Sequence, residues 1–546
     1  MKKGIWVKGI CTLFIWVLAS CGGNGEKFSN DGSGSESDEE FSGESLEGGA
    51  VTEVALNDET GSADIDFSAV TDSQRFVLMI HHYDESGRTD GFNLGSINEM
   101  AGVENLKGLS ALVDDSSGDL TEDFHEWLRN EEAGLDDEAR LDDPSGLKAA
   151  TALGEPVLGS TRSFKVINSF GGGGSYTTVT AVLRYKTENF FLYIDDRNTG
   201  GLSDDDLAEL AQPFNELIPE EKGLFGAPSD VNGDGHFSIL MTQVVNQIGG
   251  SSGGIITGFN YAVDLFSDST YPQSNKQEIF YTFVPDPDGN FGTPISKSFA
   301  LGNILPGVLP HEFQHMINFN MHYFVNDGAA ESAWLNEGAA HLAEDIYSLN
   351  ADSYMEATGI ENFARVAGYL RDIDAICFSC GASLYQRGGA YLFMRYLYEQ
   401  AEKGDLLGAA SGAELIARLL DTDATGVANV VRAAVGEDAP VAPAFRRLLG
   451  RFGLAVFMSG TGLSADARLE FEGINLRASQ DDNRGTVLDG PAVRAPGSFP
   501  ISRTIAGGSI AYIGLKGEDV GRIGGTLKLE LGAPGKAGAF LIQTGL

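Results

Sequence analysis

Two histidines and a glutamate stand at a spacing that suits metal chemistry, in His311-Glu312-Phe313-Gln314-His315. On a helix, positions i and i+4 share one face, so both imidazoles can reach one ion while Glu312 stands beside it. Two histidines leave two positions open on a tetrahedral zinc ion, one for a third protein ligand and one for water. In that arrangement Glu312 is the general base that takes a proton from the water.

The segment Trp334–Tyr347, WLNEGAAHLAEDIY, carries the candidate for the third ligand. Its Glu337 lies 22 residues after His315, which leaves room for a helix, a turn and a second helix packed back on the first. The WLNEG run resembles the gluzincin metallopeptidases, in which the glutamate of such a segment completes the zinc site. This resemblance implies that Glu337 is the third zinc ligand.

Two more polar residues follow on the helix face of Glu337, namely His341 at +4 and Glu344 at +7. Aminopeptidase-N-type gluzincins also carry a glutamate at +7, and the resemblance implies that Glu344 orients a ligating histidine. Thermolysin-type gluzincins carry an aspartate at +4, where this chain has His341. A solvated helix face is the alternative explanation of both residues.

The segment Leu384–Gln400, LYQRGGAYLFMRYLYEQ, supplies a candidate for stabilising the oxyanion that peptide hydrolysis produces. Its start resembles the Y-x-K-G segment of aminopeptidase-N-type enzymes, where the tyrosine hydrogen-bonds the tetrahedral intermediate. Tyr385 and Gly388 match that segment, and Arg387 replaces the lysine. Two alternatives stay open: Tyr385 is a core side chain of an apolar helix, or Arg387 binds a substrate carboxylate.

Four motifs together resemble the hyicolysin-like bacterial metallopeptidases: FGAPSDVNGDG at 225–235, SNKQEIFY at 274–281, HEFQHMINF and WLNEG. The resemblance covers residues 160–400. The GxMEN loop of the aminopeptidases is absent from the sequence, so we expect an endopeptidase that acts on proteins or peptides.

A second metal site is suggested by DVNGDG, in which Asp230, Asn232 and Asp234 have the spacing of the first three ligands of a calcium-binding loop. Gly235 stands at the sharp turn of such a loop. The twelfth position is Met241 and not the expected bidentate glutamate, so a complete EF-hand is not expected. A calcium loop with other ligands and an Asp-Gly turn that enters a strand both remain open.

The elements that must position these residues suggest an α+β multidomain protein. An amphipathic helix is expected at 203–218, with Ser203 as its cap. Strand patterns occur at 75–83, 161–167, 177–195, 236–245, 278–284 and 526–531. We therefore expect a β-rich N-terminal region at 61–190, a gluzincin-type catalytic domain with the HExxH helix at 191–460, and a small C-terminal β domain at 461–546.

The N-terminus has the pattern of an export signal, with Lys2 and Lys3 before an apolar run that is too short to span a membrane. The run ends in LASC, which resembles a bacterial lipobox with Cys21 as the lipidated residue. We expect a signal peptide at 1–20 and a disordered acidic tether at 21–60. The predicted location is an exported lipoprotein at the outer membrane or cell surface, attached to the membrane through its lipid.

The net charge of −41 argues against nucleic-acid binding, which needs basic patches. Cys377 and Cys380 lie close together in ICFSC, and in an exported protein a local disulfide is the leading interpretation. The sequence as a whole predicts a lipid-anchored zinc metalloendopeptidase. A surface-binding, adhesin-like lipoprotein with an inactive or structural zinc site is the alternative.

Overall fold

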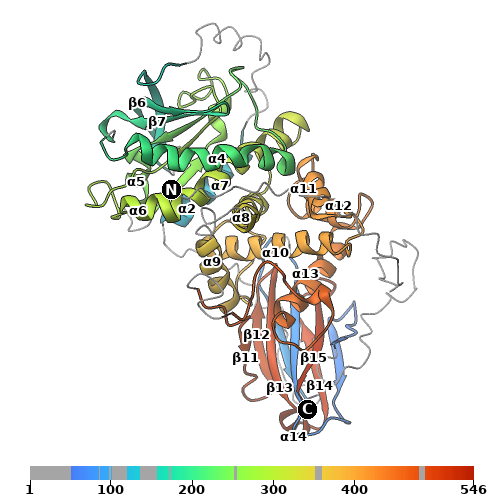
Figure 1. Ribbon diagram of the computed structural model, residues 1–546. Coiled ribbons are helices and arrows are strands. Elements are labelled where there is room, and N and C mark those ends of the chain that lie inside the picture. Colours follow the sequence, from blue (N-terminus) through green and yellow to red (C-terminus); the bar gives the residue numbers. More distant parts are fainter. Residues whose placement is uncertain are drawn as a thin grey trace, which may run out of the picture.

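The structure is a computed structural model that describes residues 51–545, apart from 85, 97–99, 101–119, 136–155, 171–173, 199, 251–254, 351–358 and 479–485. The predicted signal peptide, Cys21 and residues 21–50 of the predicted tether lie outside the described residues. Figure 1 shows an upper part built on one sheet, a middle part of helices and a lower part of packed strands. Within the described ranges, no helix combines the length and apolarity needed to cross a bilayer.

The lower part is a β-sandwich whose two sheets enclose an apolar core. One sheet has the order β1 (Val51–Glu53), β15 (Ala537–Gly545), β3 (Arg75–His82), β13 (Ser509–Lys516) and β11 (Val493–Arg494). The other has the order β12 (Ile501–Ile505), β4 (Asp90–Gly95), β14 (Thr526–Leu531) and β2 (Ser62–Asp66). Leu78, Ile513 and Leu529 are among the side chains of this core. In β14 the alternation of TLKLEL puts its leucines inside, as period two requires.

The strands of residues 51–95 pair with those of 493–545 throughout this sandwich, for example β3 with both β13 and β15. This arrangement corrects the expected separation of a β-rich region at 61–190 from a C-terminal β domain at 461–546. It also corrects the expected tether boundary at 60, because β1 pairs with β15. The alternation of apolar and polar residues identifies a strand but not the strand that pairs with it. The pairing of strands more than 400 residues apart could therefore not be predicted from local sequence patterns.

The upper part is a mixed six-stranded sheet. Its order is β5 (Thr161–Ser169), β6 (Ser175–Lys186), β7 (Phe190–Asp195), β8 (Phe237–Met241), β10 (Ile279–Thr282) and β9 (Gly258–Asn260). β7, β8 and β10 run parallel, and β9 is the antiparallel edge strand beside β10. Helix α4 (Asp204–Phe225) packs on β6 and on α7 (Leu305–Phe319).

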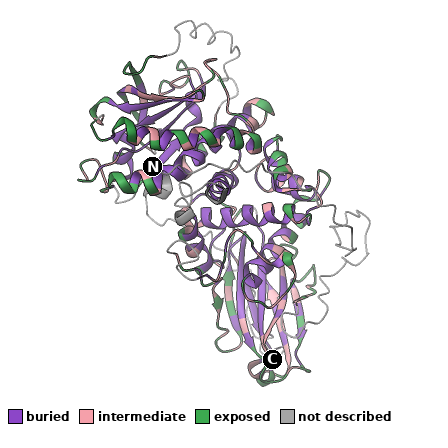
Figure 2. Cartoon of the chain, viewed as in Figure 1, coloured by how far each residue is buried: buried purple, intermediate pink, exposed green. Residues whose placement is uncertain are grey.

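The middle part is helical and joins the two others (Figure 1). Helix α8 (Ala333–Asn350) packs against α7, and α10 (Leu384–Glu402) packs against α8 and α9 (Gly359–Arg371). Next along the chain come α11 (Gly412–Leu420), α12 (Gly426–Ala434) and α13 (Val441–Met458). α13 lies on β3 and β15, and Tyr512 Oη of β13 donates to Gly453 O at 2.7 Å. Figure 2 shows that α10 and the strands beneath it are largely buried.

Helix α7 is buried over its whole length, and it contains two prolines. Pro306 lies at its start and Pro310 lies inside it. A π-helical stretch, Ala300–Ile304, precedes α7. A proline lacks the N–H donor and its ring crowds the carbonyl four residues back, and the π-helical turns widen the helix just before Pro306. The HEFQH segment then follows as regular helix.

Candidate metal centre

Helix α7 presents His311 and His315 on one face, and both side chains are buried. Their Nε2 atoms lie 3.0 Å apart. Glu337 of α8 is fully buried and completes a triangle, with carboxylate oxygens 3.6 Å from the Nε2 atom of each histidine. Zinc bonds of 2.0–2.2 Å in a tetrahedron put neighbouring ligand atoms about 3.4 Å apart. The three distances therefore fit zinc.

Neither oxygen of the Glu337 carboxylate accepts a hydrogen bond within the described part of the chain. Leaving a buried carboxylate without partners is costly, so a group with this environment is expected to bind a cation. The donor set of two imidazoles and one carboxylate is one that zinc accepts.

Each histidine is oriented through its other ring nitrogen. His315 Nδ1 lies 2.8 Å from Asn336 Oδ1, and His311 Nδ1 lies 2.9 Å from Glu344 Oε1. Both partners are oxygen acceptors, so each Nδ1 carries the proton and each Nε2 presents its lone pair to the centre. The orienting contact of Glu344 was predicted from the sequence. Asn336 belongs to the WLNEG motif, but its contact with His315 was not predicted.

His341 lies on α8 and is buried, as is Glu344. His341 Nδ1 is 3.3 Å from Glu344 Oε1, and His341 Nε2 is 4.0 Å from Glu337 Oε2. A solvated helix face does not describe these residues. His341 lies directly behind the donor triangle and shares the Glu344 carboxylate with His311.

Glu312 lies beside the triangle and is almost fully buried. Burial raises its pKa to about 7, against the lowering effect of the neighbouring His311 charge. A carboxylate with a pKa near neutrality can both accept and return a proton. Gly258 makes room for it, because a β-carbon there would lie 3.3 Å from Glu312 Oε1 and only 2.6 Å from Val308 Cγ1.

The charges around the triangle interact strongly. Burial alone lowers the pKa of His311, but the neighbouring carboxylates of Glu337 and Glu344 raise it to about 10. The pKa of Glu337 falls well below its usual range because His315, His311 and the guanidinium of Arg387 outweigh its burial. The pocket thus has excess negative charge that attracts a proton to His311, and a divalent cation would satisfy the same demand.

Arg387 and Tyr385, both near the start of α10, have different surroundings. Arg387 is buried, with Nη1 3.7 Å from Glu337 Oε2. Tyr385 is half-buried, and Arg371 of α9 lies over its ring at 5.3 Å from the centroid. Gly368, also on α9, allows this ring to approach closely. Arg387 is therefore the α10 side chain that reaches the donor triangle, and the oxyanion role of Tyr385 stays a prediction.

The acidic loop before β8 has the internal contacts of an Asx-rich turn. Gly235 N donates to Asp230 Oδ1 at 3.1 Å, and Asn232 Nδ2 donates to Asp234 Oδ2 at 2.9 Å. The structure adds Glu278, which the sequence did not suggest and which directly precedes β10. Its Oε1 accepts from Ser229 Oγ and from Val231 N, each at 2.7 Å, while the buried Oε2 has no partner among the described residues.

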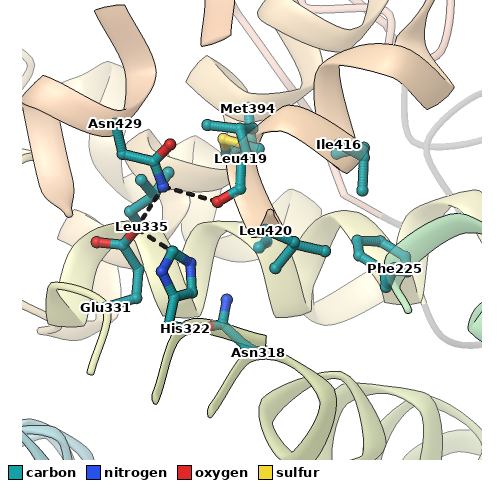
Figure 3. A pocket seen from close by; sticks show the side chains of 11 residues that line it. Phe225, Asn318, His322, Glu331, Leu335, Met394, Ile416, Leu419, Leu420 and Asn429 are labelled. Carbon is teal, nitrogen blue, oxygen red and sulfur yellow. Dashed lines mark hydrogen bonds and ion pairs between the residues drawn. The ribbon is translucent and has the colours of Figure 1, made fainter. Parts of the chain in front are cut away.

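Two other features lie away from the donor triangle. Cys377 and Cys380 form a disulfide in the turn between α9 and α10. A small cavity with room for about one water molecule lies near the end of α7. Figure 3 shows His322 and Asn429 at this cavity on either side of Glu331, whose Oε2 accepts from Asn429 Nδ2 at 2.7 Å. The zinc-ligand candidates do not line it.

Comparison with known proteins points in the same direction as the geometry. The chain is similar to the neutral metalloprotease ShpI of Staphylococcus hyicus, with 28% identity over 267 residues. The match covers 47% of this chain and 56% of ShpI, so the chain spans about half the length of that curated relative. No protein-family profile matches the chain. The similarity supports a metalloprotease and implies a metal, usually zinc, at the cluster of histidines and glutamates.

Proposed function

We propose that this protein is a zinc metalloendopeptidase of the gluzincin type that hydrolyses internal peptide bonds of proteins or peptides. The observation that carries the proposal is the buried triangle of His311, His315 and Glu337, in which neither carboxylate oxygen accepts a hydrogen bond from a described residue. The similarity to a metalloprotease and the resemblance of WLNEG to the gluzincin segment support it. The endopeptidase assignment rests on the missing exopeptidase loop.

In this proposal His311, His315 and Glu337 hold the zinc, which when bound supplies a Lewis acid that activates water and polarises the peptide carbonyl. Glu312 takes one proton from the attacking water and returns it to the leaving amine, so that the carboxylate is regenerated. Glu344 and Asn336 keep the imidazoles oriented. Oxyanion stabilisation is assigned to Tyr385 only by resemblance, whereas Arg387 is the cation beside the centre.

The proposed location rests on the sequence alone. A signal peptide that ends before a lipidated Cys21 would place the protein at the outer membrane or cell surface, with the membrane as its partner through the lipid. Metabolic labelling with a palmitate analogue tests this assignment. Label in the wild type and none in Cys21→Ala is expected, and label that persists in the variant contradicts it.

We also propose that the acidic loop binds calcium, with Glu278 in place of the missing glutamate at the end of the loop. Glu278 is buried and faces the residues on both sides of Asp230. Calcium accepts about six to eight oxygens at about 2.3–2.6 Å, so a loop that adds Asn232 and main-chain carbonyls to three carboxylates suits it. Calcium should raise the melting temperature of the wild type and not that of Glu278→Gln. An equal rise in both contradicts this site.

The test of the proposed function uses the purified full chain loaded with zinc and a mixed peptide library, beside Glu312→Gln. Cuts at internal bonds by the wild type and not by the variant are expected. Cuts only at peptide ends would replace the endopeptidase assignment with an exopeptidase. Bound zinc without cleavage by the wild type would favour the adhesin-like alternative with an inert site.

A further inference from the structure

Helix α2 (Leu120–Ala133) carries a buried ion pair that its sequence did not single out. Arg129 Nη1 lies 2.9 Å from Glu132 Oε2, and both side chains are almost fully buried. α2 belongs neither to the β-sandwich nor to the six-stranded sheet, and it packs against α8, which carries Glu337. A buried ion pair is a weak source of stability, so its location asks for a different explanation.

The pair lies against β9, the last strand of the six-stranded sheet among the described residues. Arg129 Nη2 donates to Asn260 O at 2.9 Å, and Ala262 N donates to Glu132 Oε1 at 3.1 Å. A carbonyl and the N–H two residues later face the same edge of an extended chain, and an antiparallel partner strand pairs with these two groups. β10 occupies the other edge of β9. α2 thus satisfies, with two side chains, the main-chain groups that a further strand would use.

This edge leads into the metal centre. The N–H of Asn260 donates to the carboxylate of Glu312, and α7 packs against β9. An extended peptide paired with Asn260 and Ala262 would therefore pass beside the proposed general base. Main-chain pairing to a sheet edge binds extended segments with little regard to their side chains.

Apolar side chains of α2 cover the same segment. Phe124 meets Phe259 with ring centroids 5.2 Å apart, and Trp127 meets Tyr261 at 6.1 Å. His125 is buried and lies within electrostatic reach of His311 and Glu337. α2 therefore contacts the edge of β9 through hydrogen-bonding groups and the flanking segment through aromatic rings, and its His125 is buried near the candidate metal centre.

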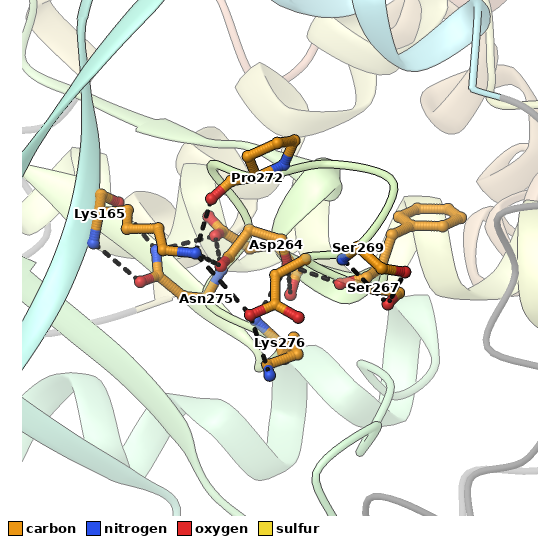
Figure 4. A network of polar contacts seen from close by, with 10 residues as sticks. Lys165, Asp264, Ser267, Ser269, Pro272, Asn275 and Lys276 are labelled. Atoms are coloured by element: carbon orange, nitrogen blue, oxygen red, sulfur yellow. Dashed lines mark hydrogen bonds and ion pairs between the residues drawn. The ribbon is translucent and has the colours of Figure 1, made fainter.

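The edge itself is held by other contacts. Just beyond Ala262, the buried carboxylate of Asp264 accepts from Tyr281 Oη at 2.6 Å and from Asn275 N at 2.7 Å. Figure 4 shows this network around Asp264 and Asn275, with the ammonium of Lys165 donating to Pro272 O at 2.6 Å. Residues outside α2 thus hold the turn after β9. If α2 left, the edge of β9 would stay in place.

We propose that α2 occupies the peptide-binding edge of β9 in place of substrate, so that an extended, unfolded peptide binds only when Arg129 and Glu132 have left Asn260 and Ala262. The proposal rests on the proposed peptidase function and adds to it the substrate class and the block that the substrate must displace. The docked state in the structure is the latent one. The measured affinity for peptides is then reduced by the fraction of molecules in which α2 is undocked.

One arm of the experiment measures cleavage of carboxymethylated casein by the zinc-loaded full chain and by Arg129→Ala. The substitution leaves the buried Glu132 carboxylate without its counter-ion in the docked state, which disfavours docking. We expect kcat/KM to rise by about tenfold or more, mainly through a lower KM. Arg451→Ala, which removes an ion pair with Asp405 far from α2, is the matched control and should show no rise. A fall or no change in Arg129→Ala contradicts the proposal.

The second arm does not need catalysis. In zinc-loaded Glu312→Gln, an unstructured peptide should increase hydrogen exchange in residues 124–133 and change the fluorescence of Trp127, a change absent after Trp127→Phe. Exchange in α2 that stays unchanged at every peptide concentration overturns the proposal. Displacement of α2 by peptide without cleavage by any Glu312-containing variant keeps this inference and overturns the peptidase function instead.

Discussion

The donor triangle of His311, His315 and Glu337 has a counterpart in the β-sandwich, where His82, Asp84 and Asp90 also lie within 4.8 Å of one another. In the sandwich the protein itself supplies the partners. Lys536 pairs with Asp84, Ser86 donates to Asp84, and Asp90 Oδ2 lies 3.1 Å from His82 Nε2. Glu337 accepts no hydrogen bond from the described residues, and its nearest guanidinium nitrogen, Arg387 Nη1, lies 3.7 Å away.

The two clusters differ in how far hydrogen bonds and ion pairs already satisfy their carboxylates. Ligand-type side chains at short distances occur in both regions, and both are largely buried. In the sandwich the Lys536 ammonium already pairs with Asp84, and His82 lies against Asp90, so a divalent ion would have to displace both partners. In the α7–α8 cluster, contacts at Nδ1 orient the rings of His311 and His315. Their Nε2 atoms point toward each other and toward the Glu337 carboxylate. We therefore expect the α7–α8 cluster to bind a metal ion and the sandwich cluster to remain an ion-pair cluster, because the two differ in hydrogen bonding and not in the closeness of their ligand-type atoms.

The largest expected effect breaks the metal centre itself. His315→Ala removes one of the three proposed ligands, and we expect zinc content to fall from about one per chain to near zero and activity to fall by about a thousandfold or more. Asp90→Asn in the sandwich should leave zinc content unchanged. Elemental analysis after dialysis measures both. Zinc lost equally from the two variants would remove the distinction between the clusters.

Glu312→Gln separates metal binding from chemistry. Because Glu312 is not among the three donors, zinc should stay bound, while loss of the general base should lower kcat by about 10²–10⁴-fold. Zinc analysis and peptide hydrolysis on the same preparation provide the measurement. A variant that retains most of its activity would show that another group moves the proton.

Glu344→Gln tests whether the contact between Glu344 and His311 Nδ1 contributes to zinc binding. The amide can no longer accept the His311 Nδ1 proton with a full charge, so zinc affinity should fall by about 10–100-fold. Competition with a zinc chelator of known affinity measures the change. Unchanged affinity would mean that the contact of 2.9 Å has no influence on the ligand.

Lys536→Met tests the sandwich cluster, with a smaller effect. Burial raises the pKa of Asp84, but hydrogen bonds from Lys536 and Ser86 outweigh it and lower the pKa to about 2. A depressed carboxylate pKa stabilises the fold above the ordinary value of about 3.8, and this contribution is lost as the pH falls towards 2.

The melting temperature of Lys536→Met should therefore lie a few degrees below that of the wild type at pH 7. The difference should shrink between pH 4 and pH 2, as followed by thermal unfolding at several pH values. A difference that does not depend on pH would assign the loss to packing of the lysine stem.

The structure brings together the residues that the sequence predicted for the candidate site, because helical periodicity positions them. His311, His315, Glu337 and Glu344 lie on two neighbouring helices, where a local spacing specifies a shared face. The contacts of Arg129 with Asn260 and of Glu278 with Val231 join segments that are distant in sequence, and no local spacing encodes them.

Less of the fold could be predicted from the sequence, because it too depends on contacts between segments that are distant in the chain. The mixed α+β character follows from strand and helix patterns, and the structure has both. The pairing of β3 with β13 and β15 depends on which apolar faces meet after collapse. The oxyanion role that the motif suggested for Tyr385 stays a prediction, and the sequence did not indicate that the ring of Tyr385 lies against Gly368 and Arg371 of α9.

The pairing of β1 with β15 has a consequence for how the chain is made. Val51 lies opposite Ile542, so a ribosome must produce nearly 500 further residues before the first strand meets its neighbour. Contacts of such long range form slowly, and the central strand β3 must wait with both its edges open. Until then, the early strands are exposed to aggregation and suit a holding chaperone. A nascent chain arrested before residue 509 should therefore remain protease-sensitive from residue 51 to residue 95.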